Sequence, residues 1–476
     1  MLTNLVWQAC TELCRRHQPR TAARYSCAMP TDPRGCPSGS AEPAARAAVE
    51  SALWRLMSFY DVPTVDLDLA IAADPGWALP HVMKAGFLAG LTEPSFMPEA
   101  AAHLRTAREL TRPAPERERG HLEAVQQLID GRWHAACRSW DELLLPWPRD
   151  ALALLWAHTW DFFRGDQVQL RQRPARALPE WEDADPLTPY VMGLYAFGLE
   201  ENHLYGQAED VGRRALEINP RGPWAIHAVA HVMEMQGRFE EGATWLRQHQ
   251  GAWAEGNGFA AHLWWHKALF RLEALDTPGV LRLIDKHLSG PVLQVTLERL
   301  DAAAILWRLY LMGEDVSALA ADLARAWPDD ETSAGFYAFN DVHHLLALLM
   351  AARMADADAL LARCAARAMA SDDARRSNHA MAREVGLPLM RALLAFARGE
   401  HAAAAEALYP LRAVAQQFGG SHAQRDLVDQ TLMAAAAHGK RIELGRALLN
   451  ERCLAKPVTP LTRYWIETLG AAPWPR

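Results

Sequence analysis

The chain has 476 residues, half of them hydrophobic, and a formal net charge of −8 at pH 7. This length is too great for one compact core, so we expect two to four domains or one extended repeat array. The acidic balance argues against a nucleic-acid partner, because such a partner needs a basic face. The excess of Arg over Lys and the abundance of Ala are typical of a bacterial, GC-rich coding sequence.

The sequence predicts neither secretion nor membrane insertion. No apolar run approaches the ~18 residues that a membrane-spanning helix requires. The N-terminus lacks the basic segment and apolar segment of a signal peptide. The seven cysteines are odd in number and form no CxxC pair, which favours free thiols in a reducing compartment. We therefore expect a cytoplasmic protein without a membrane partner.

Residues 1–41 differ in composition from the rest of the chain. Arg, Pro and Gly cluster there, which predicts a poorly ordered extension or one with a short helix at its start. Helical signals dominate residues 42–476, because Ala and Leu are frequent and strand-like alternation is rare. Breakers such as Asp74-Pro75 and Asn219-Pro220 leave stretches of about 12–15 residues, a usual helix length. We predict an all-α domain over residues 42–476.

Residues 190–250 contain the clearest internal repeat. Taking Pro220 as the last residue of one unit gives the period of about 34 residues that tetratricopeptide repeats show. Gly237 marks a turn within the next unit, which begins near Pro223. One unit cannot bury its apolar face alone, so units must stack. The pattern predicts an irregular α-solenoid of helical hairpins curled around a central pocket, with residues 150–430 forming the core. Small residues that let paired helices approach closely fall at equivalent positions: Ala196, Ala208, Ala215, Ala230 and Gly242.

Two histidine pairs with i, i+4 spacing form the main functional lead. His227 and His231 make one pair, and His262 and His266 make the other. On a helix this spacing places both imidazoles on one face, where they can bind one metal ion. The motif is not that of HExxH proteases, because Ala228 occupies the position of the glutamate. Hydrogen-bonded core histidines are the alternative interpretation, and we give the two interpretations equal weight.

Further candidate residues surround these pairs in the sequence. Trp224 and Trp265 border the histidines, where they could form the wall of a pocket for a planar ligand, although core packing is the commoner role. Arg425 follows a helix-start signal at Gly419-Gly420-Ser421 and could hold an anionic group or form an interhelical salt bridge. No phosphate-binding loop, dinucleotide fingerprint or nucleophile elbow is present.

Several segments together resemble the tetratricopeptide repeat protein 38 family. The longest is PYVMGLYAFGLEENHLYGQAEDVGRRALEINPRGPWAIHAVAHVMEMQGRFEEG, at 189–242. Others are AHTWDFFRGD, HLWWHKALF, FNDVHHLLAL, REVGLPLMRALLAFARG and GGSHAQRDLVDQ. The resemblance covers approximately residues 45–470 and implies a solenoid-like helical fold. His422 stands where the family pattern has Asn, which puts a strict role for that side chain in doubt. The pattern maps onto Glu201, His227, His231, Glu234, His262, Trp265, His266, Asn340, Asp341, His343, Gln424, Arg425 and Asp426.

The resemblance extends to the repeat protein of toxoflavin-type azapteridine biosynthesis, which implies a small-molecule enzyme of specialised metabolism. We predict a metal-dependent enzyme acting on a small polar or heteroaromatic molecule, and favour an oxidoreductase over a hydrolase. The expected cofactor is a divalent transition metal: Zn, Co, Fe, Mn or Ni. The alternatives are a scaffold that binds a protein or peptide and a metal-free small-molecule binder, and a homodimer or protein partner is also considered.

Each candidate residue has one predicted role. The predicted metal ligands are His227, His231, His262, His266 and His343. The predicted catalytic residues are Glu201, Asp341 and Arg425, and the predicted substrate-binding residues are Trp224, Trp265, Asn340 and Gln424.

Overall fold

The computed structural model describes residues 29–110, 114–328, 332–370 and 375–470. Helices account for the regular structure of these residues, and β-pairing is limited to two isolated bridges, Thr31 with Pro37 and Tyr60 with Asn257. The all-α prediction is confirmed. No helix in the described ranges combines the length and apolar character needed to cross a membrane.

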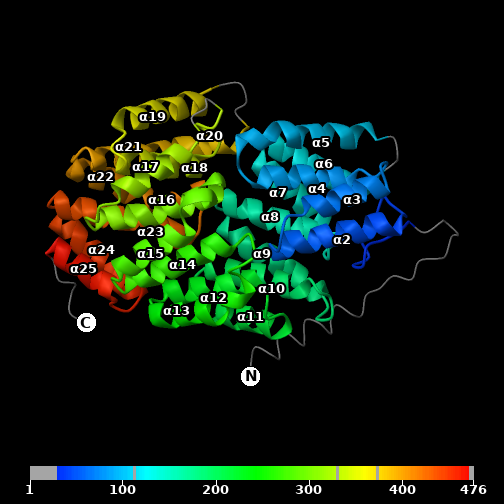
Figure 1. Ribbon diagram of the computed structural model, residues 1–476, viewed down its shortest axis with the longest axis horizontal. Helices are drawn as coiled ribbons and strands as arrows, with labels where there is room; N and C mark the ends of the chain where they lie inside the picture. Colours follow the sequence, from blue (N-terminus) through cyan, green and yellow to red (C-terminus); the bar gives the residue numbers. More distant parts are fainter. Residues whose placement is uncertain (1–28, 111–113, 329–331, 371–374, 471–476) are drawn as a thin grey trace.

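The helices follow one another as pairs joined by short turns (Figure 1). The first four pairs are α2 (Pro43–Ser58) and α3 (Thr64–Ala73), α4 (Leu79–Gly90) and α5 (Met97–Glu109), α6 (Glu116–Ile129) and α7 (Trp133–Leu144), and α8 (Ala151–Phe163) and α9 (Gln167–Ala177). The next four are α10 (Thr188–Glu200) and α11 (Tyr205–Ile218), α12 (Pro223–Met235) and α13 (Phe239–Gln248), α14 (Ala260–Glu273) and α15 (Thr277–His287), and α16 (Thr296–Leu311) and α17 (Ser317–Ala326). The remaining helices are α18 (Ala338–Met350), α19 (Met354–Ala368), α20 (Ser377–Met381), α21 (Leu387–Ala397), α22 (His401–Leu411), α23 (His422–His438), α24 (Ile442–Ala455) and α25 (Pro460–Leu469).

The two helices of a pair differ in how much of their surface they bury. In α12 every residue from Pro223 to Met233 is buried, whereas its partner α13 buries only Gly242, Trp245 and Leu246. The first helices pack against one another in succession, α10 on α12, α12 on α14, α14 on α16 and α16 on α18. Helices that are apolar all round belong in an interior, and those with one apolar stripe cover it.

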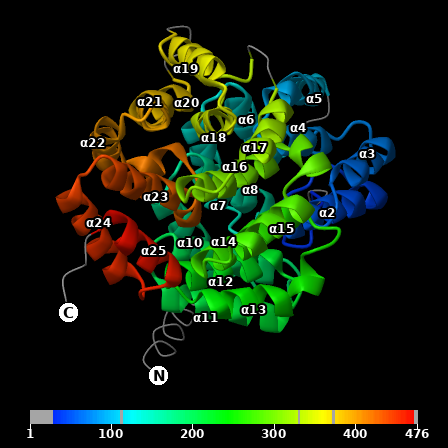
Figure 2. The same cartoon turned by 60° about the vertical axis from the view of Figure 1, so that its left-hand side comes forward.

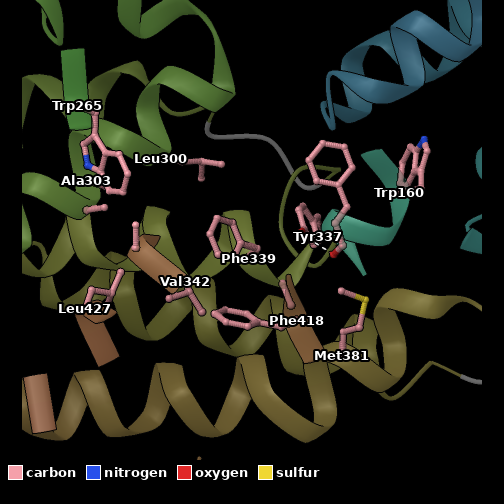
Figure 3. Packing of buried hydrophobic residues seen from close by; sticks show 14 of the residues in the cluster. Trp160, Trp265, Leu300, Ala303, Tyr337, Phe339, Val342, Met381, Phe418 and Leu427 are labelled. Carbon is pink, nitrogen blue, oxygen red and sulfur yellow. Dashed lines mark hydrogen bonds between the residues drawn. The ribbon is translucent and has the colours of Figure 1, made fainter. Parts of the chain in front are cut away.

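The row of pairs curves back on itself. Helix α23 packs against both α12 and α16, and α25 packs against α14 (Figure 2). Residues far apart in the sequence therefore meet around α12 and α14. Figure 3 shows this shared core, where Trp265 of α14 lies beside Ala303 of α16, with Val342 of α18 and Leu427 of α23 nearby. At its other end Tyr337 donates a hydrogen bond to the carbonyl oxygen of Phe163, at 2.8 Å.

Residues 190–250 form the two helix pairs that the repeat pattern predicts, α10 with α11 and α12 with α13. Gly237 lies between the last two helices with a φ of +69°, a left-handed conformation that suits glycine. The relationship of these pairs to tetratricopeptide repeats stays a prediction. The small residues of the pattern are buried at the helix contacts: Ala196, Ala208, Ala215, Ala230 and Gly242.

Residues 29–41 form a turn attached to the first helix pairs. Arg34 donates two hydrogen bonds to the carboxylate of Glu50, at 2.7 and 2.6 Å, and Ser40 bonds to Asp74. This part of the expected extension is therefore packed and ordered. Residues 1–28, with the short helix predicted at their start, lie outside the described residues. Among the described cysteines none is in a disulfide.

The close approach of α9 and α10 gives a test of packing. A Cβ atom at Gly198 would overlap the backbone carbonyl group of Leu170, so we expect Gly198→Ala to lower the free energy of unfolding by about 1–3 kcal/mol. Gly206→Ala is the control, because its Cβ would meet nothing within 4 Å. We expect the control to be neutral or stabilising by up to about 1 kcal/mol. Urea unfolding measures both, and equal stabilities would contradict the expected backbone contact.

Candidate metal centre

Four histidines of two neighbouring helices converge in the interior. His227 and His231 lie one turn apart on α12, and His262 and His266 lie one turn apart on α14. Because α12 packs against α14, both pairs face each other. His231 and His266 are fully buried and His227 nearly so, whereas the His262 side chain retains 21% exposure. The two pairs therefore meet in the interior, a convergence that the sequence alone did not establish.

The spacing of the ring nitrogens fits a shared ion. The Nε2 atom of His227 lies 2.9 Å from Nε2 of His231 and 3.1 Å from Nε2 of His262. One candidate ligand atom from each of the four residues lies within 4.8 Å of the others. Tetrahedral ligands at the usual metal–nitrogen distance of ~2.0–2.1 Å are separated by about 3.3 Å. The four rings therefore fit around one transition-metal ion.

Carboxylates orient two of the rings. His262 Nδ1 donates to Asp301 of α16 at 2.8 Å, and His266 Nδ1 donates to Glu234 of α12 at 3.0 Å. Donation from Nδ1 leaves the lone pair on Nε2, the atom that must face a metal. His266 Nε2 has no hydrogen-bond partner in the described part of the chain. Carboxylate–histidine pairs of this kind support metal ligands in many proteins.

Burial keeps three of these imidazoles neutral. Burial lowers the pKa of His231 to about 3 and holds the pKa values of His227 and His266 well below their usual range. At His227 and His266 the neighbouring histidines lower the pKa further. Neutral imidazole is the form that binds metal. Burial also raises the pKa of Glu234 to about 8, so near neutral pH this group is mainly a carboxylic acid, whose unprotonated oxygen can accept the His266 Nδ1–H.

Aromatic rings form a wall beside His227 and His262. The ring of Phe259 lies 4.8 Å from that of His227 and 5.1 Å from that of Trp224, and it stacks on Phe59 at 4.6 Å. Phe59 and Phe259 are half-buried, like His262, so this is the side on which the four-histidine cluster comes nearest to solvent. The indole N–H of Trp224 is buried without a hydrogen-bond partner in the described ranges.

A second polar group lies next to the histidine cluster. Glu200 and Glu201, at the end of α10, face His422 at the start of α23. Burial alone would raise the pKa of Glu201, but the charges of His422 and Arg425 outweigh burial and lower the pKa to about 2. Burial raises the pKa of Glu200 to about 7. Arg425 donates to Glu201 at 2.9 Å, so the predicted catalytic pair Glu201 and Arg425 forms the interhelical salt bridge considered as its alternative.

The structure places the remaining predicted residues around this centre with other contacts. Trp265 stacks on His262 with ring centroids 5.2 Å apart, and its indole N–H has no partner among the residues described. His343 of α18 donates from Nδ1 to the carbonyl oxygen of Phe339 at 2.8 Å and does not belong to the four-histidine group. Asn340 donates to the carbonyl oxygen of Thr92 at 3.1 Å. Gln424 forms a capping box with Ser421 at the start of α23, as the glycine-serine signal predicted for that helix.

Asp341 has structural contacts. Its Oδ1 accepts the Gly335 N–H at 2.9 Å, and its carboxyl group faces the Cys364 thiol of α19. Its predicted catalytic role stays a prediction.

Two important residues were missing from the sequence prediction. Asp301 had no assigned role, although it holds His262, and Glu200 was noted only as the neighbour of Glu201. Asp301 is 39 residues from its histidine partner and lies on another helix, so no local spacing signals the contact.

A cavity of about 390 Å³, lined by Arg34, Leu53, Trp77 and others, lies among the first helix pairs. None of the four histidines lines it.

No known family model matches the sequence.

The buried carboxyl group of Asp341 predicts a pH effect on stability. Burial raises its pKa to about 7, so the folded chain keeps this proton between pH 4 and 7 where the unfolded chain releases it. The free energy of unfolding therefore falls as pH rises through this range. We expect Asp341→Asn to remove up to about 4 kcal/mol of this dependence and to be more stable than the parent at pH 8.

Urea unfolding at several pH values measures the difference between the two chains. Other buried carboxyl groups contribute equally to both chains, so the difference isolates Asp341. Asp285→Asn, at an exposed position of α15, is the control. An Asp341→Asn profile parallel to that of the parent would contradict the prediction.

Proposed function

We propose that this protein is a metal-dependent enzyme that acts on a small polar or heteroaromatic molecule. The observation that carries the proposal is the convergence of four imidazoles, three of them buried and neutral, with carboxyl groups orienting two of the four. Core histidines without a ligand satisfy their nitrogens by hydrogen bonds. Here Nε2 of His266, the atom that would face an ion, has no partner among the described residues, and Nε2 of His231 and of His262 both face Nε2 of His227. This favours ligand histidines over hydrogen-bonded core histidines.

His227, His231, His262 and His266 would hold the ion, and imidazole suits Zn, Co, Fe, Mn and Ni to differing degrees. A bound ion would supply a Lewis acid or a redox centre at this position. His343 is not part of this ligand set. The carboxylates of Asp301 and Glu234 would keep the Nε2 lone pairs of His262 and His266 directed at the ion.

The aromatic wall supports a small planar substrate. Phe59, Phe259 and Trp224 lie on the side where His262 is partly exposed, so a ligand reaching the metal from solvent would contact them. The unpartnered indole N–H groups of Trp224 and Trp265 are donors for carbonyl or ring-nitrogen acceptors. An oxidative step of the azapteridine type is our proposed reaction, on the strength of the family resemblance.

The scaffold alternative is less well supported by the position of the polar residues. A peptide-binding repeat array presents them on an extended concave surface. The histidines and carboxylates of this chain instead lie between inner helices, in the interior.

Metal analysis tests the proposal directly. We expect freshly purified or metal-reconstituted protein to retain a transition metal at the four histidines after gel filtration, measured by elemental analysis. His227→Ala should lose this metal, because His227 Nε2 lies closest to two other ligands. His287→Ala is the control, since His287 stacks on Trp264 outside the cluster. Parent protein with less than about 0.2 equivalents of metal, with none regained on addition, would refute a metal-dependent function.

The carboxylate partner gives an independent prediction. Asp301→Asn keeps the size of the side chain but loses the charge that orients His262. We expect a metal dissociation constant about 10–100-fold larger, measured by competition with a coloured chelator. Asp315→Asn is the control, because Asp315 is exposed in the turn between α16 and α17. It should leave the metal dissociation constant unchanged. An Asp301→Asn affinity equal to that of the parent would show that Asp301 does not support a ligand.

A further inference from the structure

Glu200, Glu201 and His422 form a second group of metal-ligating side chains. His422 Nδ1 lies 3.3 Å from Oε1 of Glu200 and 3.7 Å from Oε1 of Glu201. One candidate ligand atom of each lies within 4.8 Å of the other two. Ligands about 2.1 Å from one ion are separated by about 3.0–3.4 Å, so the first of these spacings fits shared coordination and the second is slightly wide.

The charge of this group is incompletely balanced by the protein. Both carboxylates are buried, with Glu200 fully so and Glu201 2% exposed. Glu201 is well satisfied, because Arg425, Gln167 and the His422 backbone N–H all donate to it. Oε2 of Glu200 has no hydrogen-bond partner within the described ranges. A buried carboxylate oxygen in this state favours a cation beside it.

A buried nitrogen of His231 also lies beside the unpartnered oxygen of Glu200. Nδ1 of His231 lies 3.6 Å from Oε2 of Glu200, is fully buried, and has no hydrogen-bond partner in the described part of the chain. The Nε2 atom of the same ring faces His227 in the four-histidine cluster. The His231 imidazole therefore lies between the two groups, with one nitrogen toward each.

We propose that Glu200, Glu201 and His422 hold a second divalent transition-metal ion, separated from the four-histidine site by the His231 ring. Two carboxylates and one imidazole suit Zn, Mn or Fe, which are hard or borderline ions. Sulfur ligands would instead select softer ions. The role of His231 as a ring between two metal ions rests on the proposed function. Binding of an ion at Glu200, Glu201 and His422 does not require an ion at the four histidines.

A proton on Glu200 itself or on His422 is the competing way to balance the charge of Glu200, and metal stoichiometry distinguishes a proton from a metal ion. The probe is Co²⁺, added in excess to the chelator-stripped full-length chain and followed by gel filtration and elemental analysis. We expect about two equivalents per chain in the parent and about one in His422→Ala. The His422 side chain is partly exposed, and its backbone N–H still bonds to Glu201 in the variant.

The matched control is His203→Ala, because the His203 ring stacks on His422 at 4.5 Å and is not a member of the group. The control should keep both ions. His227→Ala should keep only the ion at Glu200, Glu201 and His422. A parent whose single ion is retained in His422→Ala, or a His422→Ala variant that keeps two ions, would overturn the second site. A parent with one ion that is lost in His422→Ala but retained in His227→Ala would support the second site and refute the four-histidine centre.

Discussion

The packing of α12 against α14 brings four imidazoles together in the interior, with only His262 partly exposed to solvent. Burial removes the hydration that would stabilise charged imidazolium, so His227, His231 and His266 are neutral and each presents a lone pair. Neighbouring neutral rings with Nε2 atoms about 3 Å apart cannot all be satisfied by one another, since each N–H serves one acceptor. A cation bound at their centre would resolve this conflict, and the surrounding structure holds the rings close enough to share one.

That surrounding structure depends on the curvature of the helix array. Asp301 reaches His262 because α16 packs on α14, and His422 reaches Glu200 because α23 returns to α10 and α12. Small residues permit the close approach: Gly198 lies against the backbone of Leu170, and Gly242 lies against the ring of Phe270. The outer helices contribute little to the site directly, but they cover the inner helices and so exclude water from the carboxylate–histidine contacts.

The two polar groups form one continuous interior network. Glu200 connects them through its contacts with His231 and His422, while Glu234 links His266 to the positive charges of Lys456 and Arg308. Opposite the network, Phe59, Phe259 and Trp224 supply an apolar face next to the one exposed histidine. Under the proposed function, the histidines would hold the metal and the aromatic wall would contact a small planar substrate, whereas a peptide groove would need its polar residues at the surface.

The sequence by itself determined the local features of this protein. Ala- and Leu-rich stretches between breakers gave the helices, and i, i+4 spacing placed His227 with His231 and His262 with His266, because both depend on the geometry of a single helix. Small residues at repeat positions also indicated where helices would touch. Tertiary structure decided which faces meet. The contacts of Asp301 with His262 and of Glu200 with His231, the separation of His343 from the cluster and the packing of residues 29–41 join segments without any fixed spacing, so only the path of the whole helix array could set them.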